Sequence, residues 1–389
     1  MKFTELSLDE YKKLRLELLQ SVEGFKEKIY KDKNSYATIG IGINIASDKI
    51  DKIWLKLVLY YLFDLLKDEI EIELMQFDSY KYSFKKIIKD TTSYKYKQYK
   101  RLIDKIADST KGLNTANLNK SIETEIQSYL KESTKDNKRL NEAELKITKN
   151  AKGEAEYIKF TLSQTQAQEL FNIMIINYEA LTLRLLNNKG FTEFGNLKEL
   201  QNKQAQRRYY KEFIPFVSAS YQDGGFIAQN KLLAQALKFQ SRFLMWALLR
   251  YDFVLNGHKE ANKWDAYARR RILQATIFNL TNKKDKELET ESEKFSTCLD
   301  IFKVLNLLDA SEDKQTYLEY FEGIDGKIDK YISKEKEAYK NKNIKNKTAN
   351  YKDDPSYSIY RSLYINPNEL KSLKELLSFY TEYLDELVP

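Results

Sequence analysis

The scarcity of glycine and proline is the feature that most limits the folds open to this chain. Its 389 residues include 12 glycines and 4 prolines. Proteins rich in β-structure or long loops need these residues at their turns, so their scarcity favours helices. Hydrophobic residues make up 42% of the chain, enough to form the cores of two or three domains. We therefore expect a predominantly α-helical protein.

Histidine and cysteine are scarcer still, with one residue of each type, His258 and Cys298. No disulfide is able to form within the chain, and no Cys/His zinc cluster can be assembled. A Ser-His-Asp triad would have to use His258, which lies in the charged, loop-like stretch "NGHKEANK". A solvated histidine is expected there. Carboxylates are the common catalytic groups that remain.

The segment Glu23–Ile45, "EGFKEKIYKDKNSYATIGIGINI", differs from the helical remainder of the chain. A capping box at Ser7 and Glu10 predicts the start of a first helix, and Gly24 predicts its end, next to Glu23. A second capping box, at Ser163 and Gln166, predicts the start of a later helix. A hairpin is expected to follow Gly24, with "KIYKD" and "YATIGIGI" on either side of the turn "KNS". Strand alternation then predicts an inner face and a nearly bare outer face open to a ligand. The inner face would carry Ala37, Ile39, Ile41 and Ile43, and the outer face Tyr36, Thr38, Gly40 and Gly42.

Two acids in this segment have contrasting surroundings. Glu23 faces the negative end of a helix dipole and has apolar neighbours, which favours the protonated form that a general acid needs. Asp32 lies at the mouth of the turn and is expected to stay ionised, with Thr38 able to hold a water. Two such carboxyls are the pattern of glycoside hydrolysis. Taken alone, however, these residues favour a simpler interpretation, in which Glu23 ends a helix and Asp32 forms a turn.

The string "EGFKEKIYKDKNSYATIGIG" resembles the catalytic signature of the T-even phage lysozyme family: E-G, then K-x-Y-x-D, then an aromatic residue two before T-I-G-x-G. Three weaker similarities follow in the same order. Residues 166–171 resemble that family's next helix start, "FVSASYQDGGFIAQNKLL" its cleft lining, and "ARRRILQATIF" its closing Arg-Arg helix. The resemblance covers roughly residues 1–45 and 160–282.

The resemblance implies roles for particular residues. Glu23 would be the general acid, while Asp32 and Thr38 would position and activate the attacking water. The family cleaves the β-1,4 bond between N-acetylmuramic acid and N-acetylglucosamine in peptidoglycan, and the resemblance implies no metal and no cofactor. The chain departs from the family at Ile43, where His is frequent, and at Gln274, where Glu is usual. The expected substrate contacts are Gly40, Gly42, Tyr221, Gln222 and Asn230.

We thus expect an α+β, predominantly α-helical fold: a lysozyme-like core with a small N-terminal β-hairpin, a large helical insertion and a helical C-terminal domain. The catalytic domain would comprise residues 1–45 and 160–282, the insertion residues 46–159, and the C-terminal domain residues 283–389. In that last domain, Asn366 and Pro367 predict the start of a final helix. Its heptad-like apolar stripe comprises Leu370, Leu373, Leu377, Tyr380, Leu384 and Leu387.

The expected function is peptidoglycan hydrolysis, by an endolysin or by an antibacterial effector that a secretion machine delivers. The alternative is a non-catalytic protein that binds the cell wall or belongs to a phage tail or secretion apparatus. The net charge of +8 favours an anionic partner without selecting one. The expected partners are peptidoglycan and, for an effector, an immunity or adaptor protein, without nucleic acid or stable membrane insertion. The charged N-terminus lacks a signal-peptide core, so we expect synthesis in the cytoplasm and action on the cell wall after release.

Overall fold

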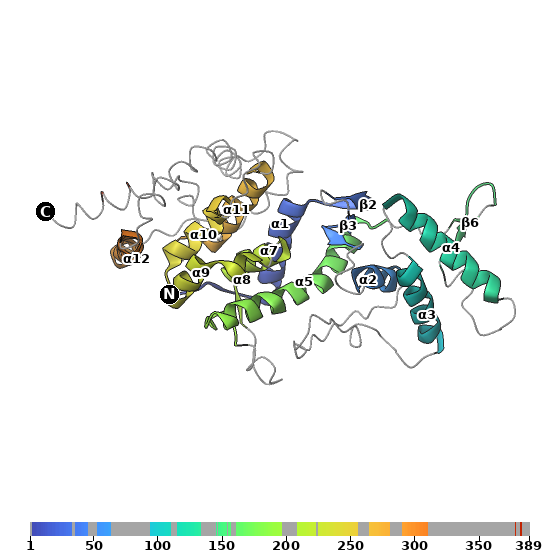
Figure 1. Ribbon diagram of the computed structural model, residues 1–389, viewed down its shortest axis with the longest axis horizontal. Helices are drawn as coiled ribbons and strands as arrows, with labels where there is room; N and C mark the ends of the chain where they lie inside the picture. Colours follow the sequence, from blue (N-terminus) through green and yellow to red (C-terminus); the bar gives the residue numbers. More distant parts are fainter. Residues whose placement is uncertain are drawn as a thin grey trace. The chain divides into compact units, whose positions relative to one another are not determined.

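The computed structural model is predominantly helical with small antiparallel sheets (Figure 1). This confirms the coarse part of the expected fold, an α+β chain in which helices dominate. It describes residues 2–32, 36–45, 53–63, 94–109, 115–133, 145, 147–153, 155–156, 161–196, 208–222, 225–255, 264–280, 290–309, 378 and 382. His258 and most of the expected final helix lie outside these residues. None of the described helices is long and apolar enough to cross a membrane.

The chain divides into two compact units. Unit 1 comprises Met1–Val22 and Tyr178–Pro389, and unit 2 comprises Glu23–Asn177. The boundaries fall inside helices, at the end of α1 (Leu8–Glu23) and in the middle of α5 (Gln164–Asn188). The two units are defined by the contacts within each of them. The three domains expected from the sequence resemblance stay a prediction.

Unit 2 contains a three-stranded antiparallel sheet and a group of helices. The sheet has the order β2-β3-β4 and is followed by helices that pack in sequence, α2 on β4 and α3, and α3 on α4. Helix α2 is buried in this group, with Leu55, Val58 and Leu59 fully covered. The elements before α5 are β2 (Lys26–Lys31), β3 (Ala37–Gly40), β4 (Ile43–Asn44), α2 (Ile53–Leu62), α3 (Tyr94–Ser109), α4 (Thr115–Ser133), β5 (Thr148–Lys149) and β6 (Ala155–Glu156).

The second strand of the expected hairpin is shorter than the sequence pattern predicts. The chain turns at Ile41 and Gly42 and returns as β4, because Gly40 and Gly42 adopt φ values of +65° and +70°. These values lie in the left-handed region that glycine favours. The expected bare face is also wrong at Gly40, where an added Cβ would lie 3.4 Å from Ala167 and 3.5 Å from Leu162. At Gly40 that face is therefore filled by packing rather than left open.

Unit 1 is built mainly from helices, with α10 packed on α9, α11 and α12, and α7 packed on α11. A short two-stranded ladder pairs Glu5 with Tyr210 near the N-terminus. The core includes the fully buried rings of Trp246, Phe216 and Phe278. The elements are β1 (Glu5–Leu6), β7 (Tyr209–Tyr210), α7 (Phe213–Gln222), α8 (Gly225–Gln229), α9 (Lys231–Lys238), α10 (Arg242–Leu255), α11 (Trp264–Phe278) and α12 (Glu291–Asp309).

Both expected capping boxes are confirmed. The backbone N–H of Ser7 donates to Glu10 Oε2 at 3.0 Å, and the N–H of Glu10 donates back to Ser7 Oγ at 3.3 Å. Ser163 and Gln166 make the same reciprocal pair, at 2.9 and 3.2 Å, at the start of α5. Each box satisfies backbone donors that a helix start leaves without a partner, so local sequence sets these boundaries.

A buried carboxylate joins the N-terminal strand to the helices of unit 1. Glu212 is fully buried and accepts hydrogen bonds from the backbone N–H of Thr4, at 3.0 Å, and from Arg242 Nη2, at 2.7 Å. Arg242 also donates to the carbonyl oxygens of Phe278 and Asn279, at the end of α11. The pair therefore links β1, α10 and α11 through one network.

Replacing this carboxylate should destabilise unit 1 strongly. Glu212→Ala leaves the largely buried Arg242 guanidinium without its charge partner. Breaking a buried ion pair in this way lowers the free energy of unfolding by about 3–5 kcal/mol. Glu5→Ala removes an exposed carboxylate on β1, three residues before α1, and should cost under about 0.5 kcal/mol. Urea unfolding followed by circular dichroism measures both values. Equal effects of the two substitutions would contradict this account of Glu212.

Candidate active site

The β2–β3 hairpin frames the candidate site. Its strands pair in the register Tyr30 opposite Thr38 and Lys31 opposite Ala37. Just beyond this pair, the N–H of Asp32 donates to the carbonyl oxygen of Tyr36 at 3.0 Å, and the N–H of Tyr36 donates to Asp32 Oδ1 at 2.8 Å. Asp32 thus closes the hairpin with both its backbone and its side chain. An ionised carboxylate has about four acceptor positions, so this bond does not use up its capacity.

Thr38 occupies the central strand of the sheet. It lies opposite Tyr30 on β2 and opposite Asn44 on β4, so these three side chains form a row on one face. Thr38 is 3% exposed, and its Oγ1 donates a long hydrogen bond of 3.4 Å to the carbonyl oxygen of Tyr36. The hydroxyl is therefore oriented toward the closed end of the hairpin, and the expected role in holding a water stays a prediction.

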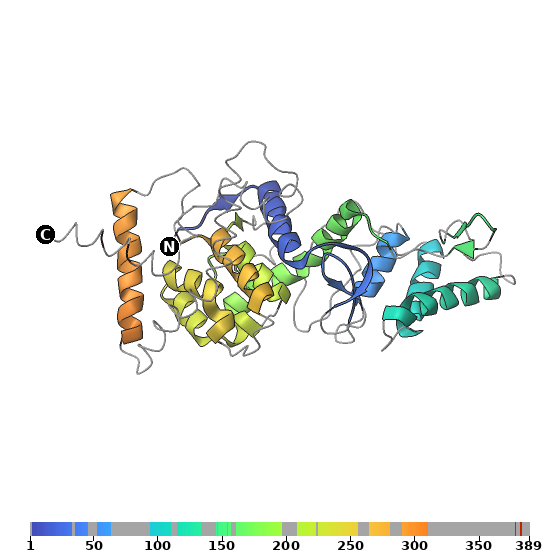
Figure 2. The same cartoon turned by 90° about the horizontal axis from the view of Figure 1, so that it is seen from above.

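Glu23 is the last residue of α1, as the sequence predicted. Gly24 follows with φ +72°, and no atom lies within 4 Å of the position that its Cβ would occupy. Figure 2 shows the chain passing from the end of α1 directly into the strands of the hairpin. The left-handed residue thus ends the helix and leaves the half-buried Glu23 side chain close to the start of the sheet.

The Tyr30 phenol responds to both acids. Burial raises the pKa of its phenol, and the negative charges of Glu23 and Asp32 raise this pKa further. The charges of both carboxyls thus act on the Tyr30 phenol. Thr38 lies opposite the same tyrosine in the sheet.

Sequence reasoning assigned no role to Tyr30 or to Asn44. The signal for Tyr30 was present, because it is the tyrosine of the K-x-Y-x-D pattern and stands two residues before Asp32. Residues two apart on a strand share a face. Asn44 had no such signal, since its place beside Thr38 depends on the turn at Ile41 and Gly42.

The two glycines of the motif occupy different surroundings. Gly40 is buried against Leu162 and Ala167, so no ligand is expected to contact its Cα. Gly42 is half-buried in the turn between β3 and β4. A substrate contact at Gly42 stays a prediction.

The other expected sugar contacts belong to unit 1. Tyr221 is the next-to-last residue of α7, and its ring lies edge-on to Tyr178, with ring centres 4.8 Å apart. The Oε1 atom of Gln222 is buried without a hydrogen-bond partner among the described residues. Asn230 caps α9, where its Oδ1 accepts the N–H of Leu233 at 2.9 Å. Asn230 therefore has a structural role, and sugar binding by all three side chains stays a prediction.

The two departures from the family pattern are both buried. Ile43 is fully buried in β4, where it adds to the apolar side of the sheet. Gln274 is also fully buried, and its Nε2 donates to Ser218 Oγ at 2.8 Å while its Oε1 accepts from Arg271 Nη1 at 3.2 Å. A neutral amide at this position can both donate and accept, so it joins the two helices without a buried charge.

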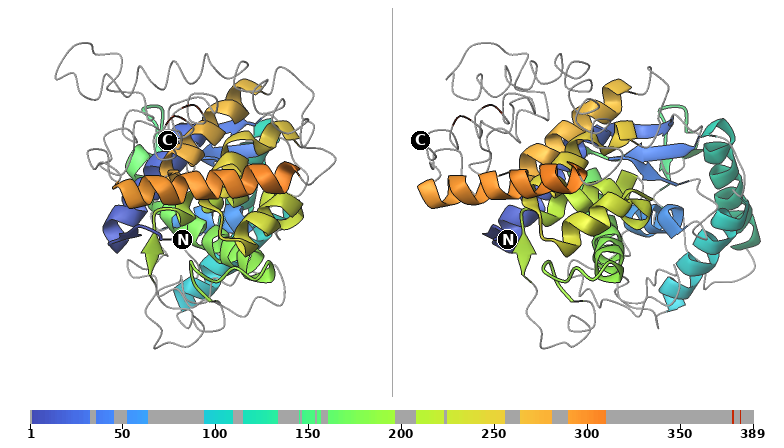
Figure 3. Two further views of the ribbon diagram at one scale, coloured as in Figure 1. Left: turned by 90° about the vertical axis from the view of Figure 1, so that its left-hand side faces the viewer. Right: turned by 60° about the vertical axis from the view of Figure 1, so that its left-hand side comes forward.

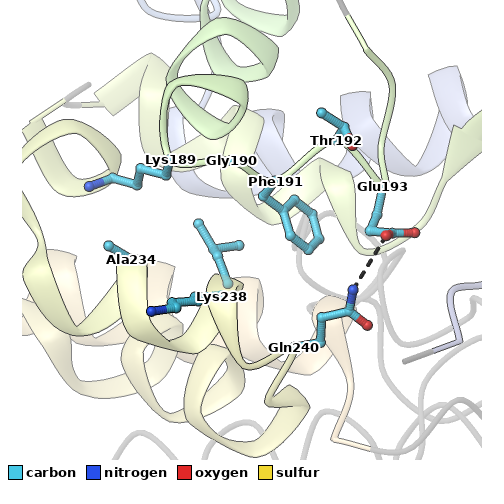
Figure 4. Close-up of a pocket in the computed structure, with 9 residues that line it drawn as sticks. Lys189, Gly190, Phe191, Thr192, Glu193, Ala234, Lys238 and Gln240 are labelled. Atoms are coloured by element: carbon cyan, nitrogen blue, oxygen red, sulfur yellow. Dashed lines mark hydrogen bonds between the residues drawn. The ribbon is translucent and has the colours of Figure 1, made fainter.

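A surface pocket of about 380 Å³ lies between the loop after α5 and helix α9 (Figure 4). Phe191 and Leu237 supply apolar surface, and Lys189 and Lys238 line the pocket beside them. At its other end, Gln240 Nε2 donates to Glu193 at 3.4 Å. With one carboxylate, the pocket lacks the acid pair of a glycoside hydrolase, and it holds none of the expected catalytic residues.

Comparisons with protein-family models, curated proteins and solved structures found no match for this chain. Within the described residues, no group of three or more His, Cys, Asp or Glu side chains is arranged to hold a metal ion. The candidate site therefore rests on the hairpin geometry and on the sequence motif.

The surroundings of Tyr30 lead to a titration prediction. Its phenol should lose its proton above the ordinary value of about 10. Since the folded pKa is raised, stability is expected to fall as the pH rises above that value, where the unfolded phenol ionises first. Tyr30 is identified in the NMR spectrum of ring-¹³C-labelled tyrosines by the signal that Tyr30→Phe removes.

Glu23→Gln should lower the pKa of Tyr30 without restoring its ordinary value, because burial is the largest cause of the shift. Glu27→Gln provides the matched control, since Glu27 is exposed on the same strand and does not contribute to the shift. An unchanged Tyr30 titration in Glu23→Gln would show that the two side chains are not neighbours.

Proposed function

We propose that this protein is a muramidase that cleaves the β-1,4 bond between N-acetylmuramic acid and N-acetylglucosamine in peptidoglycan. The observation that carries this proposal is the hairpin register, which sets Tyr30 opposite Thr38 and closes at Asp32, while the charges of Glu23 and Asp32 both act on the Tyr30 phenol. These are the acids whose spacing resembles the T-even phage lysozyme signature. The motif and the hairpin register together support this assignment, and the proposal includes a lysozyme-like core.

In the proposed reaction, Glu23 donates its proton to the glycosidic oxygen as the bond to the anomeric carbon breaks. A water held by Asp32 and Thr38 attacks that carbon from the opposite face, and Asp32 accepts the proton that the water loses. The product is a free sugar end, and proton exchange with solvent returns both acids to their starting states. No metal or cofactor takes part in this proposal.

The surroundings of Glu23 suit the role of an acid. It lies at the C-terminal end of α1, where the helix dipole disfavours a negative charge. In this proposal Asp32, whose charge acts on the Tyr30 phenol as that of Glu23 does, takes the complementary role of base.

We further propose that the enzyme is made in the cytoplasm and reaches the cell wall after release or delivery. An endolysin would depend on a pore protein, and a delivered effector on a secretion machine and an immunity or adaptor protein. The alternative, a non-catalytic wall-binding or structural protein, gains support from one observation. Asp32 and Thr38 both interact with the backbone of Tyr36, as residues with a purely structural role would.

Loss of the proposed acid should abolish hydrolysis. Glu23→Gln removes the proton donor while keeping the shape of the side chain, so release of soluble muropeptides from peptidoglycan sacculi should fall about 10²–10⁴-fold. The exposed Glu27→Gln should keep the original rate. Chromatography of the released fragments measures both rates, and circular dichroism shows that each variant is folded. If the original protein binds sacculi and releases nothing, the binding alternative is correct.

The proposed water-mediated attack also predicts inversion at the anomeric carbon. The first product from the β-linked glycan should be the α-anomer, because no covalent sugar–enzyme intermediate forms. Proton NMR in the first minutes of hydrolysis distinguishes the anomers before they interconvert. Early appearance of the β-anomer, or a sugar adduct trapped on Asp32, would replace this mechanism with a retaining one and leave the substrate unchanged.

A further inference from the structure

Helix α12 is anchored to unit 1 along one face. Cys298, Ile301 and Val304 are buried on this face, and the helix packs on α10. Asp300 Oδ2 also accepts the backbone N–H of Phe243 at 2.8 Å, at the first turn of α10. Apolar contact and a helix cap thus fix the orientation of α12, which Figure 3 shows in orange as one uninterrupted helix.

A second face of the same helix carries large apolar side chains that no described residue covers. Phe295, Leu299 and Phe302 are 45%, 40% and 56% exposed. They are three of the six large exposed apolar side chains recorded among the described residues, and they lie on one helix at spacings of four and three. We call these three residues the α12 stripe. Apolar surface concentrated in this way typically marks a place where another element binds.

The end of the chain contains an apolar stripe of matching period. Its residues follow one another at alternating spacings of three and four, the spacing of the inner positions of a coiled coil. Ser378 and Glu382 are described there, and both are helical and exposed, as expected for positions outside such a stripe. The stripe comprises Leu370, Leu373, Leu377, Tyr380, Leu384 and Leu387.

We propose that the C-terminal segment, residues 366–389, binds as a helix along the α12 stripe of its own chain. Two helices with this apolar period bury their stripes against each other by interlocking side chains. Residues 310–365 join the segment covalently to α12, so binding within one chain has an effective concentration that does not fall on dilution. A second copy of the chain would have to reach the same concentration in free solution to compete.

Hydrogen exchange of the full-length protein, followed by mass spectrometry, tests this interaction. The backbone amides of residues 366–389 should exchange more slowly than in a synthetic peptide of that sequence, and equally slowly at low and high protein concentration. Exchange at the peptide rate would overturn the proposal and leave the stripe for a different protein. Protection that disappears on dilution would also overturn it, in favour of a second copy.

Paired variants then locate the contact. Phe302→Asp should speed exchange in residues 366–389 by about tenfold or more, since burial of one such side chain shifts an equilibrium by that factor. Leu377→Asp should have the same effect on the amides of residues 295–302. Ser296→Asp and Ser378→Asp place the same charge beside each stripe on exposed positions and should leave exchange unchanged. If the controls act as strongly as the stripe variants, or if neither stripe variant acts, the proposed contact is absent.

Discussion

The pairing of β2 with β3 is the interaction on which the candidate site depends. It places Tyr30 opposite Thr38 and brings Asp32 to the closed end of the hairpin. A shift of this register by one residue would turn Thr38 to the other face of the sheet and separate it from Tyr30. The same pairing is supported on both edges, by β4 on one side and by the bond from Leu162 N–H to the carbonyl oxygen of Glu27 on the other.

Asp32 shows how one residue can serve both structure and chemistry. Its backbone and one carboxylate oxygen close the turn, which holds the side chain in a single position. A positioned base is what water activation requires, because catalysis gains from groups held in place before the reaction. The closing of the turn by Asp32 is therefore compatible with both a catalytic and a non-catalytic protein. Activity measurements distinguish these two interpretations.

Unit 1 places its buried polar groups differently. Gln274 with Ser218, Thr182 with Ser220, and Glu212 with Arg242 all satisfy one another inside the packed helices. Buried polar groups that are paired in this way hold elements in a specific arrangement, since any other arrangement would leave them without partners. These contacts explain how the helices of unit 1 keep their positions.

Local sequence determined where several elements begin and end. The capping boxes at Ser7 and Ser163 and the left-handed Gly24 act within a few residues, so their patterns predicted the helix boundaries and placed Glu23 at the end of α1. Tertiary packing alone decided that Gly40 is covered by Leu162 and Ala167, more than a hundred residues away. It also decided that Asn44 lies beside Thr38 and that Gln274 bonds Ser218. Helix boundaries depend on residues that are neighbours in the chain, so a single sequence shows them directly. The side chains that pack against a given residue come from distant parts of the chain, and only the tertiary structure shows which they are.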